Sequence, residues 1–150
     1  FVVLLFMSLG TINLYAQKIN QDTLVYQTIT DFRLDTTAFI RHNFVDRAAS
    51  YDGKSFAQLM DDLNLCPMIM GIGYSFGESG ERLFSSIRLY IPINNNARSF
   101  IHVSWEEPVS MPLTAERLLR KNGMYKWMDD YVAIFADYKI GRVVTNIREH

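Results

Sequence analysis

Two alternating stretches decide the fold, Leu83–Ile91 (LFSSIRLYI) and Phe100–Trp105 (FIHVSW). In both stretches apolar residues recur at every second position, which is typical of strands that bury one face. Residues 92–99, which contain a proline and three asparagines, join them. The pattern therefore predicts an antiparallel hairpin.

The alternation also predicts which side chains share a face of this hairpin. The apolar residues of both stretches share one face if Leu89 lies opposite Val103 or opposite a residue an even number of positions from Val103. A polar and aromatic face then remains, made of Phe84, Arg88, Tyr90, Phe100 and His102, with Ser104 and Glu106 beyond them. With Leu89 opposite Val103, Arg88 lies within reach of Glu106, and we expect these two side chains to form an ion pair.

Helices are expected before and after the hairpin along the chain. Thr36 or Thr37 is a suitable cap for a helix that continues to about Ala48. Ser55 begins a second helix that ends at Leu63, with Gln58 in the position that completes a capping box. Thr114 is the expected cap of a third helix, which Gly123 interrupts.

The remaining segments complete the predicted layer structure. Aromatic and apolar residues recur at helical spacing from Trp127 to Tyr138, so Trp127, Tyr131 and Phe135 are expected on one buried helix face. Met68–Tyr74 and Ile140–Ile147 are expected to be strands, whereas the glycines after Met70 are interpreted as turn residues. The fold class is therefore α+β, with a small antiparallel sheet of three to four strands packed against two to four helices.

The chain divides into a leader, an arm and one domain. Phe1–Ala16 is an apolar stretch that ends in a small residue, which is typical of a signal peptide with cleavage after Ala16. Residues 17–35 are expected to form an N-terminal arm or an edge strand, and residues 36–150 a single α+β domain. We expect an exported protein, periplasmic or secreted, without a transmembrane segment in the mature chain.

Composition excludes some partner classes. Of the 150 residues, 49% are hydrophobic and 21% charged, which is the balance of a folded domain. The net charge of −1 provides no basic field for nucleic acid or an anionic membrane, so no nucleic-acid partner is expected. The expected partner is an unidentified ligand or protein of the cell envelope.

Several motifs carry a family resemblance: Tyr51-Asp52-Gly53-Lys54-Ser55-Phe56, the helix to Leu63, the strand Met68–Tyr74, and Trp105-Glu106-Glu107-Pro108. In these the chain resembles small exported Bacteroidetes-type proteins of unknown function, which implies export and the α+β order but no activity. Residues 51–75 also resemble one PASTA unit, a cell-wall-binding module.

The hairpin face is the predicted binding surface. Arginine and aromatic side chains dominate recognition sites, so the predicted ligand-binding residues are Arg88, Tyr90, His102 and Trp105. The alternative is that the last helix covers this face.

Catalytic and metal chemistry have weaker support in the sequence. Cys66 is the single cysteine, and between Leu65 and Pro67 it is expected to be a small buried apolar residue. No histidine has a second ligand at zinc-site spacing, and no cofactor or metal is expected. Adjacent Glu106 and Glu107 are expected to point to opposite faces of a strand.

Three functions stay open at this point. The chain is expected to be a non-catalytic binding or scaffolding domain of the periplasm or cell envelope. The alternatives are a small envelope hydrolase, in which His102 would meet Cys66 or converging carboxylates, and a secreted protein-binding or inhibitor module.

Overall fold

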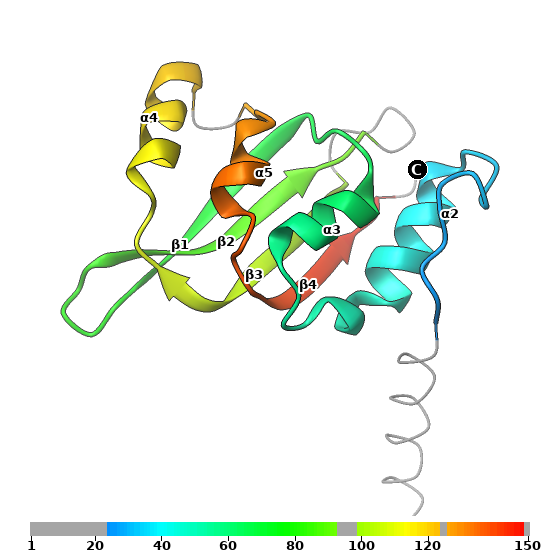
Figure 1. The fold of residues 1–150 in the computed structure, drawn as a ribbon, viewed down its shortest axis with the longest axis horizontal. Coiled ribbons are helices and arrows are strands. Elements are labelled where there is room, and N and C mark those ends of the chain that lie inside the picture. Colours follow the sequence, from blue (N-terminus) through cyan, green and yellow to red (C-terminus); the bar gives the residue numbers. More distant parts are fainter. Residues whose placement is uncertain (1–23, 93–98, 124–125, 149–150) are drawn as a thin grey trace, which may run out of the picture.

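A single antiparallel sheet and a layer of helices make up the domain. The computed structural model describes residues 24–92, 99–123 and 126–148. The four strands follow the chain order across the sheet, and the helices pack on one of its faces (Figure 1). The strands are β1 (Ile69–Phe76), β2 (Arg82–Tyr90), β3 (Phe100–Val109) and β4 (Ile140–Asn146). The predicted α+β class and the predicted hairpin of β2 and β3 are thus confirmed.

The helical elements are short. They are α2 (Thr36–Arg41), the π-helical turn η1 (His42–Asp46), the 3₁₀ turn η2 (Ala48–Tyr51), α3 (Phe56–Leu63), α4 (Leu113–Asn122) and α5 (Asp130–Phe135). None of the helices in the described part of the chain has the length and apolar character needed to cross a membrane.

The first helical segment differs from its prediction in cap and in geometry. Asp35, rather than a threonine, caps α2 by accepting a hydrogen bond from the Ala38 amide. The α-helix changes to a π turn at His42, and the buried Asn43 and Arg47 of this region bond to the backbone of residues 24–27. Residues 24–35 therefore form an arm held by these side chains, and they contain no strand.

Helix α3 confirms its predicted start and end. The Ser55 hydroxyl accepts from the Gln58 amide, while the Gln58 side chain accepts from the Ser55 amide, so the capping box is complete. The helix ends at Leu63, and its C-cap residue, Asn64, adopts the left-handed conformation. Its buried face is formed by Phe56, Leu59 and Leu63.

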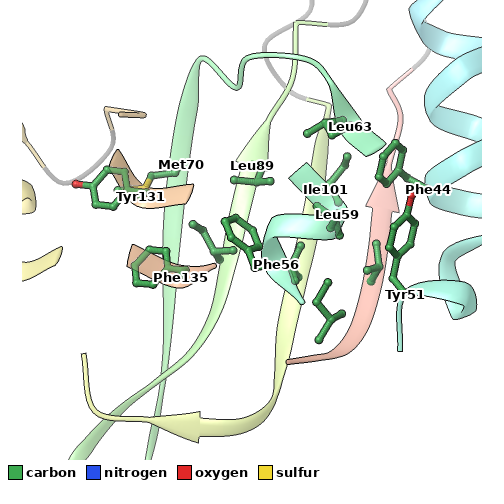
Figure 2. Packing of buried hydrophobic residues seen from close by; sticks show 14 of the residues in the cluster. Phe44, Tyr51, Phe56, Leu59, Leu63, Met70, Leu89, Ile101, Tyr131 and Phe135 are labelled. Atoms are coloured by element: carbon green, nitrogen blue, oxygen red, sulfur yellow. The ribbon is translucent and has the colours of Figure 1, made fainter. Parts of the chain in front are cut away.

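The hydrophobic core lies between the helices and one face of the sheet (Figure 2). Phe135 is fully buried and contacts the rings of Phe56, Phe84 and Trp105 at centroid distances of 6.3, 5.0 and 6.2 Å. The predicted buried stripe of Trp127, Tyr131 and Phe135 is confirmed, although Trp127 precedes α5 rather than belonging to it.

Bulges adjust which side chains reach the core. The pairing of β2 with β3 is irregular between Phe84 and Ser86, so the strict alternation expected from the sequence fails there. Phe84 was predicted on the polar hairpin face, but it is fully buried in the core. In the pairing of β2 with β1, Ser85 is an extra residue between the Tyr74–Phe84 and Gly73–Ser86 pairs, and it reverses the parity of Phe84 relative to Ser86.

The two edges of the sheet differ in whether other segments form hydrogen bonds with them. Ile140 at the start of β4 exchanges backbone hydrogen bonds with Gly53 and Lys54, and the Thr145 hydroxyl donates to the Phe44 carbonyl. At the other edge, no strand of the described chain pairs with the outer side of β1. Figure 1 shows α2 and η1 on the β4 side of the sheet and α4 on the β1 side.

Candidate binding site

The face of the sheet away from the helices is the candidate site, and we call it the open face. The register places one set of side chains there, alternating with the core residues: Gly71, Gly73, Ser86, Arg88, Tyr90, Phe100, His102, Ser104, Arg142, Val144 and Asn146. The alternative that the last helix covers this face is wrong, because α5 packs on Phe84 and Trp105 on the core face.

Arg88 and His102 form the centre of the open face. They are directly opposed on neighbouring strands, β2 and β3. The Arg88 guanidinium lies 4.6 Å from the centroid of the Phe100 ring, and Tyr90 packs beside that ring at 5.7 Å. The two aromatic rings therefore support the cation from one end of the hairpin.

His102 is held in its neutral form. Its Nε2 lies 3.3 Å from the Ser104 hydroxyl, while its Nδ1 is buried and has no hydrogen-bond partner. Burial, and then the neighbouring charge of Arg88, lower the pKa of His102 below its ordinary value of 6.5. The imidazole is thus uncharged at neutral pH and has one nitrogen without a partner.

A hollow of about 120 Å³ lies beside this pair. It is lined by Gly71, Ile72, Gly73, Ser86, Arg88 and His102. The glycines form its floor, since a Cβ atom at Gly73 would collide with the Ser86 hydroxyl and one at Gly71 would lie 3.5 Å from Arg88 Cβ. The volume equals that of a few water molecules, so it suits a compact polar group rather than a whole ligand.

The electrostatics of this hollow favour an acidic group. The buried Arg88 Nε has no hydrogen-bond partner. No lining residue of the hollow is acidic, and within the described part of the chain no carboxylate forms an ion pair with Arg88. A carboxylate or phosphate oxygen would satisfy the guanidinium, and the Ser86 hydroxyl is a further donor of the same lining.

The structure brings together three of the four predicted site residues. Arg88, Tyr90 and His102 share the open face, whereas Trp105 lies on the core face and is only 5% exposed. The Trp105 ring contacts Phe56 and Tyr138, so it does not extend the open face.

Sequence reasoning missed the glycines of this site. Gly71 and Gly73 were interpreted as turn residues, but they lie within β1, opposite Arg88 and Ser86. Their spacing of two was the available signal, because two glycines at one parity of a strand leave a trough on one face.

The predicted ion pair between Arg88 and Glu106 is wrong. Leu89 lies opposite Ile101 instead of Val103, and this shift of two residues preserves the parity while placing Arg88 against His102. Glu106 lies beyond the Ser104/Trp105 irregularity, where its amide donates to the Lys139 carbonyl.

Glu106 and Glu107 line a second hollow, of about 260 Å³, with Asp137. The pairing of β3 is irregular on both sides near these residues, with register shifts in the β2–β3 and β3–β4 ladders. Trp105, Tyr138 and Lys139 complete most of the lining.

Cys66 is exposed rather than buried, with its thiol 3.6 Å from the Pro67 carbonyl. It does not line the hollow that contains His102, so the predicted alternative of a Cys66–His102 pair gains no support. Within residues 24–92, 99–123 and 126–148, no cluster of three or more potential metal ligands is found.

The comparisons with known proteins give no match: no family model, no curated protein and no solved structure resembles this chain significantly. The function is therefore argued from the site alone.

Proposed function

We propose that this chain is a non-catalytic, exported binding domain of the periplasm or cell envelope, and that its open face binds an acidic group of the ligand. One observation carries the proposal: Arg88 and His102 are directly opposed across β2 and β3, and each has a buried nitrogen without a partner. Unpartnered buried polar nitrogens are costly, and a bound anion would remove that cost at the Arg88 Nε, which is a donor.

The chemistry of the lining supports binding rather than turnover. A fixed guanidinium, a neutral imidazole and a serine hydroxyl orient an anion. Phe100 and Tyr90 lie next to Arg88 and offer apolar surface to the rest of the ligand. Export and the resemblance to Bacteroidetes-type exported proteins and to a PASTA unit belong to the same proposal.

The test is a titration of the ¹⁵N-labelled protein with inorganic phosphate and with acetate, followed by amide NMR. We expect shifts at Ser86, Arg88 and His102, and their loss in the Arg88→Gln variant. Arg117→Gln on α4 is the matched control and should bind like the parent. Absence of shifts on the open face, or equal binding by Arg88→Gln, would overturn the proposal.

A small envelope hydrolase is the second candidate, favoured by the hollow of Glu106, Glu107 and Asp137. Carboxylates beside the aromatic rings of Trp105 and Tyr138 are a setting in which glycosidic bonds can be cleaved by a pair of acids. Hydrolysis of aryl glycosides by the parent, abolished in Glu106→Gln or Asp137→Asn without loss of fold, would establish this function in place of the first.

A further inference from the structure

We infer that the outer edge of β1 receives an extended acidic segment of a partner protein, which adds to the sheet as a further strand. This inference concerns the free backbone edge of β1, and it shares Arg88 and Gly71 with the site of the proposed function. Addition of a strand gives affinity through main-chain hydrogen bonds and specificity through pockets for alternate side chains.

The edge itself meets the requirements for strand addition. β1 spans eight residues, Ile69–Phe76, and contains neither a charged residue nor a proline. Charges, prolines, β-bulges and covering segments are devices by which proteins block a sheet edge, and the irregularity of the β1–β2 ladder at Gly73/Tyr74 has its extra residue, Ser85, on β2 rather than on β1. The β4 edge has such cover from Gly53, Lys54 and Phe44, whereas no strand of the described chain pairs with the outside of β1.

A side-chain pocket accompanies this edge on the helical side. A hollow of about 540 Å³ lies between β1 and α4, lined by Ile72, Tyr74, Arg82, Glu116, Leu119, Arg120 and Gly123. Its apolar residues come from both β1 and α4, so a large aliphatic or aromatic side chain of an added strand has a place there.

The charged residues next to the β1 edge indicate which side chains the added strand carries at its other positions. Arg82 lies over the Tyr74 ring, with its guanidinium carbon 3.4 Å from the ring centroid, and Arg120 lines the same hollow from α4. On the open face, Arg88 neighbours Gly71 of β1. Three arginines thus adjoin the edge, against one acid, Glu116, in the hollow.

These arginines are available to a partner. In the described part of the chain none of Arg82, Arg88 and Arg120 forms an ion pair. The β1–β2 turn carries two acids, Glu78 and Glu81, and Glu81 accepts a hydrogen bond from the Ser79 hydroxyl. An added strand with acidic residues at some positions and an apolar residue facing α4 complements this edge.

A second copy of the chain fits the edge less well. Antiparallel pairing of two β1 strands would bring the arginines of both copies toward one interface, and β1 itself contributes no carboxylate. Like charges across an interface disfavour association. The occupant is therefore a strand of different, acidic sequence.

The experiment uses the full chain and a blocked peptide of about ten residues in which glutamate and valine alternate. A lysine–valine peptide is the charge control, and two further peptides carry N-methyl groups on one or the other set of alternate amides. We expect the glutamate peptide to bind, to slow hydrogen exchange of β1 amides but not of β4 amides, and to lose binding when one of the two sets is methylated.

Arg120→Glu supplies the matched variant, because Arg120 is exposed on α4 and lies away from the open face. We expect it to weaken binding of the glutamate peptide about tenfold or more, whereas Arg117→Glu, on the same helix but outside this hollow, should have little effect. Phosphate binding at Arg88 should be unchanged in both variants, so failure here is distinguishable from failure of the proposed function.

Three results would overturn the inference. They are equal binding of the glutamate and lysine peptides, binding that tolerates methylation of either set, and concentration-dependent dimerisation of the free protein that protects the β1 amides. The last result would identify a second copy as the occupant.

Discussion

The two faces of the sheet differ in what they bury: one carries apolar core residues, and the other carries polar residues with unsatisfied nitrogens. On the core face, Leu89 and Ile101 oppose each other and are fully buried beneath the helices. On the open face, the next pair along, Arg88 and His102, stays half-buried with unpartnered nitrogens. Stability is concentrated on one face and unsatisfied polar chemistry on the other, which is the division expected of a scaffold that presents a site.

The largest effect should come from truncating an aromatic residue of the core face. Phe135→Ala removes a fully buried ring that touches several others, so we expect a loss of about 3–5 kcal/mol in the free energy of unfolding. Phe100→Ala on the open face should cost about 1 kcal/mol or less. Urea denaturation of both variants measures the difference, and similar losses would contradict the division between the faces.

A smaller effect is expected where the strands approach closely. A Cβ atom at Gly141 would lie 2.9 Å from the Glu106 Cα, and this backbone has to move to admit it. We expect Gly141→Ala to lower the free energy of unfolding by about 1–3 kcal/mol. Gly71→Ala, whose Cβ meets only ordinary contacts on the open face, should stay within about 0.5 kcal/mol of the parent.

The smallest effect concerns the protonation of His102. Because its folded pKa lies below the ordinary value of 6.5, the unfolded chain binds more protons at mildly acidic pH, and the stability contributed by neutral His102 is lost as the pH falls from 6.5 through the lower folded pKa. Arg88→Gln removes one cause of the shift, so the pKa of His102 should rise toward its ordinary value and this loss should shrink.

Arg142→Gln is the control for that measurement. Arg142 also lies on the open face, opposite Ser104, but it is not among the causes of the His102 shift. NMR titration of the His102 ring follows both variants. A His102 pKa that is unchanged in Arg88→Gln, or raised equally by Arg142→Gln, would show that the two side chains are not electrostatically coupled.

The hairpin and α3 were predictable because local signals agree there. Alternation marks β2 and β3, and Ser55 with Gln58 marks the start of α3. The register was not predictable from parity, since pairing Leu89 with Ile101 or with Val103 puts the same residues in the core. Only the strand pairing itself distinguishes Glu106 from His102 as the neighbour of Arg88.

The missed parts of the candidate site depend on tertiary contacts. Ser85 and Ser86 are equally suited to a bulge, so the sequence does not reveal that Phe84 turns to the core. The trough at Gly71 and Gly73 can be recognised as part of a site only when the strand pairing shows that Arg88 and Ser86 lie opposite these glycines. In β3, Trp105 has the parity of the buried Ile101 and Val103, so the alternation by itself separates Trp105 from the other predicted site residues.

The bond between the Thr145 hydroxyl and the Phe44 carbonyl joins residues 101 positions apart. β4 lies between β3 and the segment of η1 and η2, so the core on that side closes only after nearly the whole chain is available. Before that closure α3, with eight residues, is too short to be a stable helix in isolation. Such non-local closure makes folding slow relative to helical bundles, and a chain released before Asn146 is expected to stay unfolded.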